Sequence, residues 1–168
     1  MRILGIDPGY AIVGWGIVDF VGGRFSTAAY GAVTTPAGED FPKRLQDIYS
    51  DLNELIDKYK PDCLAIERLY FNTNTTTAID VAQARGVIVL AAQTKGLCIN
   101  EYTPLQVKQS VTGYGRAEKR QVMEMVKSLL GLKTIPKPDD TADALALAVC
   151  HGHYSASSFS RIYMEAKK

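Results

Sequence analysis

The sequence predicts an α/β fold in which a mixed five-stranded sheet carries helices on both faces. Residues 2–34 show three strand patterns joined by short turns. Three strands connected in this way most simply form an antiparallel meander. Amphipathic helical patterns then alternate with two short apolar runs, which supply two parallel strands. With 168 residues, 46% of them apolar, the chain is long enough for one domain with a sizeable core.

The first three strands are expected over residues 2–6, 12–20 and 24–34. The first of them ends at Asp7, where Pro8 and Gly9 turn the chain. Side chains alternate with a period of two along the second strand, and Gly22-Gly23 is a hairpin signal before the third.

Helical periodicity begins near Phe41 and ends at Pro61. A short apolar run then leads to Glu67 and predicts a strand buried on both faces. The remaining elements are a loop over 68–77, a helix over 78–94, a strand over 97–102, and helices over 104–111, 117–130 and 140–153. We therefore expect one domain over 1–154, followed by a C-terminal tail over 155–168.

The helix expected over 78–94 contains an unbroken apolar run from Val87 to Ala92. Because no polar stripe survives there, we expect this helix to be buried on all sides. Two environments satisfy that expectation: the core of the chain itself, or a contact with a second subunit. The residues assigned to such a subunit interface are Arg85, Val87, Val89 and Leu90.

Cysteine spacing and charge distribution limit the function classes. No two of Cys63, Cys98 and Cys150 form a C-x-x-C pair, which excludes a zinc ribbon and a dithiol redox motif. An odd cysteine count, no signal peptide and no apolar run of about 18 residues predict a cytoplasmic protein without a membrane span. The net charge is +1, but residues 102–133 hold six basic and two acidic residues, which fits a polyanion-binding face or solvated helix faces.

Four carboxylates stand where predicted elements end or begin. Asp7 and Glu67 each end a predicted buried strand, and such strand ends form the usual ligand crevice of a mixed sheet. Asp140 and Asp143 share one face at the start of a helix. If this helix packs beside both strands, the four acids converge, and their repulsion favours Mg²⁺ as a counter-ion. Two such ions can clamp the attacking and departing oxygens of a phosphodiester, with Asp7 as the bridging ligand.

Each acid also has a purely structural alternative. Asp7 precedes Pro-Gly and fits a turn. Asp139, Asp140 and Asp143 fit a helix cap and a first helical turn, where negative charge is favourable. Glu67 is harder to explain in this way, because an acid beside buried apolar residues needs a partner. The two histidines near the end of the last helix are expected to be structural rather than catalytic.

Six segments resemble, in order over about residues 1–153, the RuvC family of Holliday-junction resolvases. They are Gly5-Ile6-Asp7-Pro8-Gly9, Ala65-Ile66-Glu67, Gln83-Ala84-Arg85-Gly86, Gln106-Val107-Lys108-Gln109, Ala117-Glu118-Lys119 and Ala142-Asp143-Ala144-Leu145-Ala146. The resemblance implies an RNase H-like fold and a homodimeric endonuclease that resolves four-way DNA junctions by paired symmetric nicks in recombination and repair. By position, the catalytic acids of the family fall on Asp7, Glu67, Asp140 and Asp143. The spacing favours Asp140 over Asp139, which then becomes the helix cap.

The resemblance also implies cofactors, DNA contacts and partners. The DNA-contacting lysines of the family fall on Lys108 and Lys119, and its base-contacting aromatic falls on Tyr70, beside Phe71. The implied cofactor is Mg²⁺, two ions per subunit, with Mn²⁺ as a substitute, and the implied protein partner is the RuvA–RuvB branch-migration complex. Phosphate contacts supply affinity rather than sequence readout, and we expect them from a basic patch of Lys108, Arg116, Lys119 and Arg120.

Three other functions share parts of this pattern. The segments Gly5–Tyr10 and Gly14–Gly16 also resemble the first phosphate loop of actin-like phosphatases and sugar kinases, which need a second such domain. Another RNase H-fold nuclease, acting on RNA–DNA hybrids or RNA, would keep the four acids. A non-catalytic junction-binding module would keep the basic patch without needing the acids.

Overall fold

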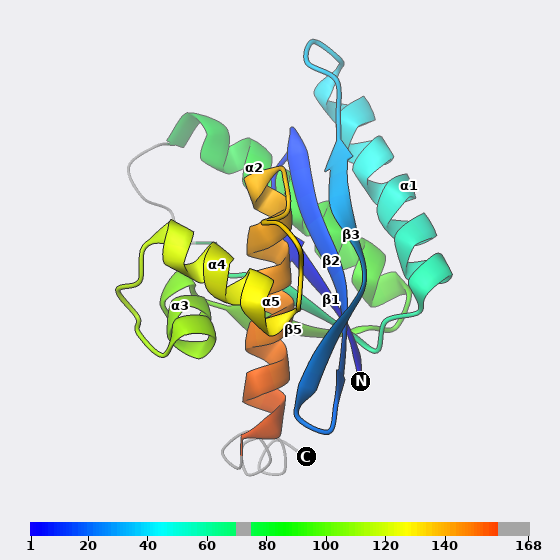
Figure 1. Ribbon diagram of the computed structural model, residues 1–168. Coiled ribbons are helices and arrows are strands. Elements are labelled where there is room, and N and C mark those ends of the chain that lie inside the picture. Colours follow the sequence, from blue (N-terminus) through cyan, green and yellow to red (C-terminus); the bar gives the residue numbers. More distant parts are fainter. Residues whose placement is uncertain (70–74, 158–168) are drawn as a thin grey trace.

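The structure, a computed structural model, describes residues 1–69 and 75–157 (Figure 1). Within this part of the chain, one sheet has five strands in the order β3-β2-β1-β4-β5. The strands are β1 (Arg2–Asp7), β2 (Ile12–Val21), β3 (Arg24–Thr34), β4 (Cys63–Glu67) and β5 (Cys98–Tyr102). The first three form an antiparallel meander, and β4 and β5 run parallel to β1, so the predicted mixed sheet is confirmed.

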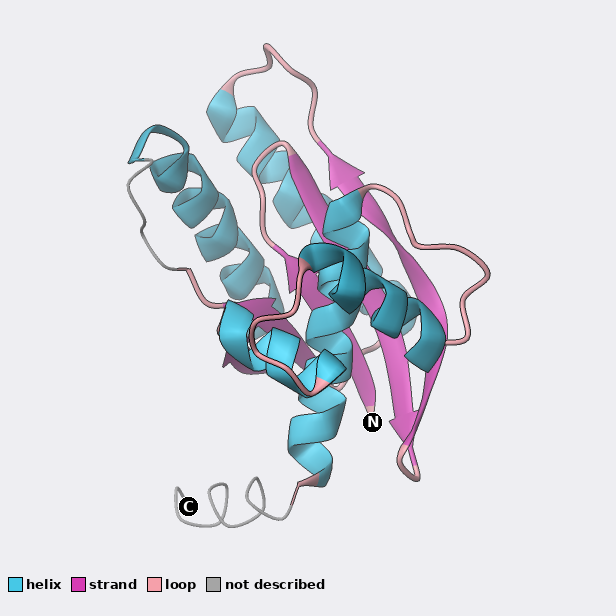
Figure 2. Cartoon of the chain, turned by 60° about the vertical axis from the view of Figure 1, so that its left-hand side comes forward, coloured by secondary structure: helices cyan, strands magenta, loops and turns pink. Residues whose placement is uncertain are grey.

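Helices cover both faces of the sheet (Figure 2). They are α1 (Phe41–Tyr59), α2 (Thr75–Thr94), α3 (Pro104–Thr112), α4 (Lys119–Leu129) and α5 (Asp139–Ala156). α1 and α2 enclose one core, which includes Leu4 and Ile6 of β1, and α5 encloses the other, which includes Ile3. Successive residues of β1 therefore face opposite cores, as a strand buried on both sides requires. In residues 1–69 and 75–157, no helix is long and apolar enough to cross a membrane.

Capping interactions set where α3 and α4 begin. The Thr103 hydroxyl accepts a hydrogen bond from the backbone N–H of Gln106, and the side-chain oxygen of Gln106 accepts one from the backbone N–H of Thr103. The side chain of Gln121 accepts from the Glu118 amide in the same way, so α4 begins two residues later than the predicted helix. The other boundaries lie within one helical turn of the predictions. α5 runs to Ala156, and residues 158–168, most of the expected tail, lie outside the described range.

The described residues bury only one face of α2, so they do not enclose this helix in the core of the chain. The other expected environment, a contact with a second subunit, stays a prediction. The inner face of α2 is buried against α1 and the sheet through Ala84, Ile88, Ala91 and Ala92. Its outer face carries Leu90, which is 58% exposed, because no other described element packs on that side. An apolar run without a polar stripe thus spans both a buried face and an open one.

Glycines allow the backbone of α5 to lie directly on the sheet. Gly5 and Gly16 are opposite each other in β1 and β2, and Gly14 is opposite Asp7. A Cβ atom on Gly5 would lie 2.0 Å from the carbonyl oxygen of Ala144, and one on Gly14 would lie 2.0 Å from that of Asp140. Only residues without a side chain permit this approach, so these glycines fix the height of α5 above the sheet.

We expect Gly14→Ala to destabilise the protein by about 2–4 kcal/mol, because the added methyl group forces α5 away from β2. The midpoint of urea unfolding measures this loss. Ser128→Ala, at an exposed position of α4, is the control and should change the free energy of unfolding by less than about 0.5 kcal/mol. Equal midpoints for Gly14→Ala and the control would contradict the close packing of α5 on the sheet.

Candidate active site

Strand direction brings Asp7 and Glu67 to one edge of the sheet. β1 and β4 are neighbouring parallel strands, and Ile6 pairs with Ile66 immediately before the two acids. In each strand the residue four positions earlier lies in the core beneath α5. Because side chains alternate along a strand, Asp7 and Glu67 point to this same face.

The start of α5 reaches the same edge. Gly14, which pairs with Asp7, lies directly under the backbone of Asp140. The buried hydroxyl of Thr141 donates a hydrogen bond of 3.0 Å to the carbonyl of Gly31 in β3 and so ties the first turn of α5 to the sheet. Asp140 and Asp143 therefore stand over the ends of β1 and β2, close to Asp7.

The carboxylates act on one another electrostatically. Burial raises the pKa of Asp7 to about 7, and the charges of Asp143, Glu67 and Asp140 add to the effect. Burial, followed by the charge of Asp143, also raises the pKa of Glu67. The pKa of Asp143 is raised chiefly by burial. Asp139 is not among the charges that raise the pKa of Asp7, which agrees with the preference for Asp140 as the member of this cluster.

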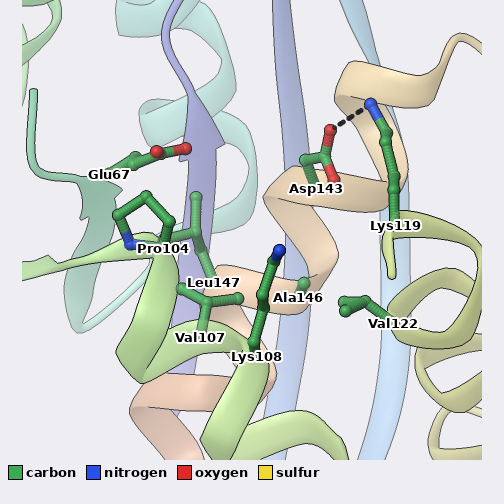
Figure 3. A pocket seen from close by; sticks show the side chains of 9 residues that line it. All are labelled: Glu67, Pro104, Val107, Lys108, Lys119, Val122, Asp143, Ala146 and Leu147. Atoms are coloured by element: carbon green, nitrogen blue, oxygen red, sulfur yellow. Dashed lines mark ion pairs between the residues drawn. The ribbon is translucent and has the colours of Figure 1, made fainter. Parts of the chain in front are cut away.

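A cleft of about 250 Å³ opens beside these acids (Figure 3). Glu67 and Asp143 lie on opposite sides of it, and Lys108 of α3 points toward the space between them. Lys119, the first residue of α4, reaches across to Asp143 with 2.9 Å between Nζ and Oδ2. The cleft thus combines carboxylates with two lysines on an apolar floor, an arrangement suited to a phosphate diester and a cation.

Comparison with known proteins identifies the family. A sequence model of "Crossover junction endodeoxyribonuclease RuvC" matches residues 3–151. The chain belongs to the RuvC family. The RuvC protein of Alkaliphilus metalliredigens is 61% identical over 91% of this chain and 93% of its own length, and that of Rubrobacter xylanophilus is 58% identical over 89% and 83%.

Solved structures agree with this membership. Thermus thermophilus RuvC superposes with a TM-score of 0.86 at 34% identity, covering 92% of this chain and 95% of the other. The same protein in complex with a Holliday junction substrate gives a TM-score of 0.84 at 32% identity, with the same coverage. The yeast mitochondrial resolvase Ydc2, at 15% identity, shares the fold with a TM-score of 0.71 over 98% of this chain and 86% of its own. The RNase H-like fold expected from the sequence is confirmed.

The donor chemistry of the site fits the divalent cations implied for a RuvC-family enzyme. Carboxylate oxygens are the preferred ligands of Mg²⁺, and the pKa values of Asp7 and Glu67 are raised by burial and then by neighbouring negative charge, both of which a cation would offset. In residues 1–69 and 75–157, however, no three acidic, histidine or cysteine side chains converge closely enough to hold an ion together. A cation held by three of these acids at once would require rotation of their side chains.

Asp139 is not the helix cap that the sequence suggests. Pro138 occupies the cap position with an extended backbone, so Asp139 is the first helical residue. Its carboxylate contacts Lys137 at 2.7 Å and Lys119 at 3.8 Å. Asp139 thus adds negative charge to the first turn of α5 and pairs with Lys119 and Lys137 at the rim of the cleft, rather than joining Asp7, Glu67, Asp140 and Asp143.

The other predicted site residues are distributed around this edge. Arg116 and Arg120 are exposed, one before and one just after the start of α4, and neither lines the cleft. Tyr70 and Phe71 lie outside the described residues. Arg85, assigned to a subunit interface, turns inward: its Nε donates to the Glu67 carbonyl at 3.2 Å, and its guanidinium also binds Glu101.

Both histidines have structural partners, in agreement with the prediction. The buried ring of His151 bonds to the Tyr102 hydroxyl at 2.7 Å, and that of His153 contacts the Ser110 carbonyl at 3.0 Å. His151 is eight residues beyond Asp143, about 12 Å along the helix. Sequence reasoning missed Thr141, whose role depends on a contact with β3, although it lies between two singled-out aspartates.

We expect Asp7→Asn to raise stability at pH 8 in the absence of divalent cations. The raised pKa of Asp7 means that its protonated form favours folding, and this contribution is lost as the pH rises from about 4 to about 7. Asparagine mimics the protonated form, so the gain should be about 2–4 kcal/mol at pH 8 and should vanish below pH 4.

Urea unfolding in EDTA at several pH values measures this effect. The control is Glu54→Gln on the exposed face of α1, which should follow the wild type across the range. An Asp7→Asn variant no more stable than wild type at pH 8 would show that Asp7 is not under electrostatic stress.

Proposed function

We propose that the chain cuts four-way DNA junctions by metal-dependent hydrolysis, with the catalytic acids Asp7, Glu67, Asp140 and Asp143. Membership of the RuvC family supports the reaction class. The observation that carries the residue assignment is the common edge: β1, β4 and α5 each bring acids to it, and the pKa of Asp7 responds to all three others.

The described groups divide the work of phosphodiester hydrolysis. When bound, two divalent cations would lower the pKa of the attacking water and stabilise the charge of the departing 3′ oxygen. Asp7 would contribute to both cation sites, because it lies on the central strand and faces the other three acids. Lys108 and Lys119 would bind the phosphate oxygens and align the scissile bond in the cleft. Mn²⁺ would replace Mg²⁺, since carboxylates accept both.

The proposed DNA contacts come from two segments of the chain. Lys108, Lys119, Arg116 and Arg120 come from α3, α4 and the loop between them, and they would bind the backbones of the junction arms. Tyr70 and Phe71 follow β4 closely in the chain and would stack on bases at the crossover. These contacts favour a distorted junction over a straight duplex, because stacking requires exposed bases.

We further propose that the protein acts as a homodimer through the outer face of α2. Ile79 and Leu90 are 62% and 58% exposed there, and Val87 and Val89 are partly buried beside them. Gly86, with open space around its Cβ position, would allow a second helix to approach closely. Arg85 would support the helix from the inner side rather than contact the partner. A two-fold dimer matches the symmetry of a four-way junction. The dimer would act in the cytoplasm together with the RuvA–RuvB complex.

A cleavage assay tests the reaction. An end-labelled four-way junction with Mg²⁺ should give symmetric nicks in two strands of like polarity, and Asp7→Asn should reduce the rate at least about 10³-fold while junction binding persists. Parallel reactions contain a linear duplex and an RNA–DNA hybrid. Cleavage of the hybrid would assign a general RNase H-fold nuclease instead, and binding without cleavage in Mg²⁺ or Mn²⁺ would leave a binding module.

Analytical ultracentrifugation tests the dimer. Leu90→Glu should shift the protein to monomers, because it places a charge in an apolar interface. Leu105→Glu is the matched control, since Leu105 on α3 is also 58% exposed but lies away from α2. If both variants dimerise like the wild type, the subunit interface lies elsewhere.

A further inference from the structure

We propose that Lys119 serves as an exchangeable counter-ion: it occupies Asp143 in the DNA-free protein and passes to a DNA phosphate when the junction binds, which frees Asp143 for cations. This inference rests on the proposed function, since it assumes that Asp143 takes part in cation binding. It adds a role for the lysine that phosphate binding alone does not provide, namely the coupling of DNA binding to cation binding.

The geometry places Lys119 between two competing partners. Its Nζ lies 2.9 Å from Asp143 and 3.8 Å from Asp139. Yet 56% of its side chain remains exposed, whereas the Asp143 side chain is only 31% exposed. The ammonium group can therefore be reached by a phosphate in the cleft without movement of α4. The carboxylate that it covers lines that same cleft.

The charge of Lys119 reaches beyond its direct partner. Burial and the neighbouring acids raise the pKa of Asp7 and of Glu67, and the charge of Lys119 opposes that rise, although neither acid forms an ion pair with it. A lysine in this place stabilises the acids as a group when no divalent cation is present. It also repels a cation that approaches them and occupies an oxygen that the cation needs as a ligand.

Lys108 provides an internal comparison. It lines the same cleft and points between Glu67 and Asp143, but the described part of the chain gives it no ion pair within 4.0 Å (Figure 3). Both lysines are placed to meet a phosphate. Only Lys119 also holds a candidate cation ligand, so the exchange should be its property alone.

Coupling of this kind is reciprocal. If a phosphate draws Lys119 from Asp143, DNA raises the affinity for divalent cations, and cations raise the affinity for DNA by the same factor. DNA-free protein then holds cations weakly, and the complete site assembles mainly on substrate. Removal of the lysine should strengthen cation binding in DNA-free protein and reduce the coupling by a similar factor.

Mn²⁺ binding to DNA-free protein, measured from the electron paramagnetic resonance signal of the free ion, tests the exchange without cleavage. Lys119→Met should bind Mn²⁺ roughly 5–20-fold more tightly than wild type. Lys119→Arg, which keeps the charge, should retain weak binding. Lys108→Met, the matched control, removes a charge from the same cleft without freeing a carboxylate, so it should tighten Mn²⁺ binding much less than Lys119→Met does while losing junction affinity.

A second arm measures junction affinity with and without Ca²⁺, which binds the same oxygen ligands. The increase caused by Ca²⁺ should be smaller in Lys119→Met than in wild type or Lys108→Met. Unchanged Mn²⁺ affinity in Lys119→Met, or equal increases in both methionine variants, would overturn the exchange. Junction cleavage by the wild type in that case would leave the proposed function standing, whereas tighter Mn²⁺ binding without any cleavage would support the exchange and refute the nuclease.

Discussion

The close contact between the backbone of α5 and the sheet is the constraint on which the site depends. Gly5, Gly14 and Gly16 leave no side chains beneath the helix, so its first turn settles over the ends of β1 and β2. A larger residue at Gly14 would lift the end that carries Asp140 and leave the far end in place. The site is therefore positioned by residues that have no chemical function, and its geometry is as rigid as the core beneath it.

This placement concentrates charge that the fold alone does not neutralise. Asp7 and Glu67 are half-buried at the ends of their strands, and the first two turns of α5 add three aspartates. Negative charge at a helix start is favourable in itself, which offsets part of the repulsion. Lys119 and Lys137 offset more of it from the rim, on the solvent side of the acids. The remaining stress falls on Asp7, where burial and the charges of the neighbouring acids raise the pKa to about 7.

The fold could be predicted largely from the sequence because its periodicities are strong and local. The common location of the four acids could be predicted too, because strand ends and an i,i+3 spacing already restrict where side chains point. What could not be predicted depends on contacts between distant segments. The bond from Thr141 to Gly31 and the ion pair of Lys119 with Asp143 join elements whose relative position no local pattern specifies. The environment of the outer face of α2 could not be decided for a related reason: an all-apolar run does not indicate whether the chain itself or a second subunit covers each side.

Repulsion at the start of α5 should push that end of the helix off the sheet, yet the helix is held along its whole length. Thr141 ties the first turn to β3, and His151 ties the last turns to Tyr102 at the end of β5 through a buried bond of 2.7 Å. Between them, the helix buries an almost continuous apolar surface from Ala142 to Cys150. Burial of that size stabilises the helix by far more than the few kcal/mol that a cluster of carboxylates costs. The chain can therefore keep an electrostatically unfavourable site in place before any cation arrives, because the element that carries the charge is also the element most firmly packed in its core.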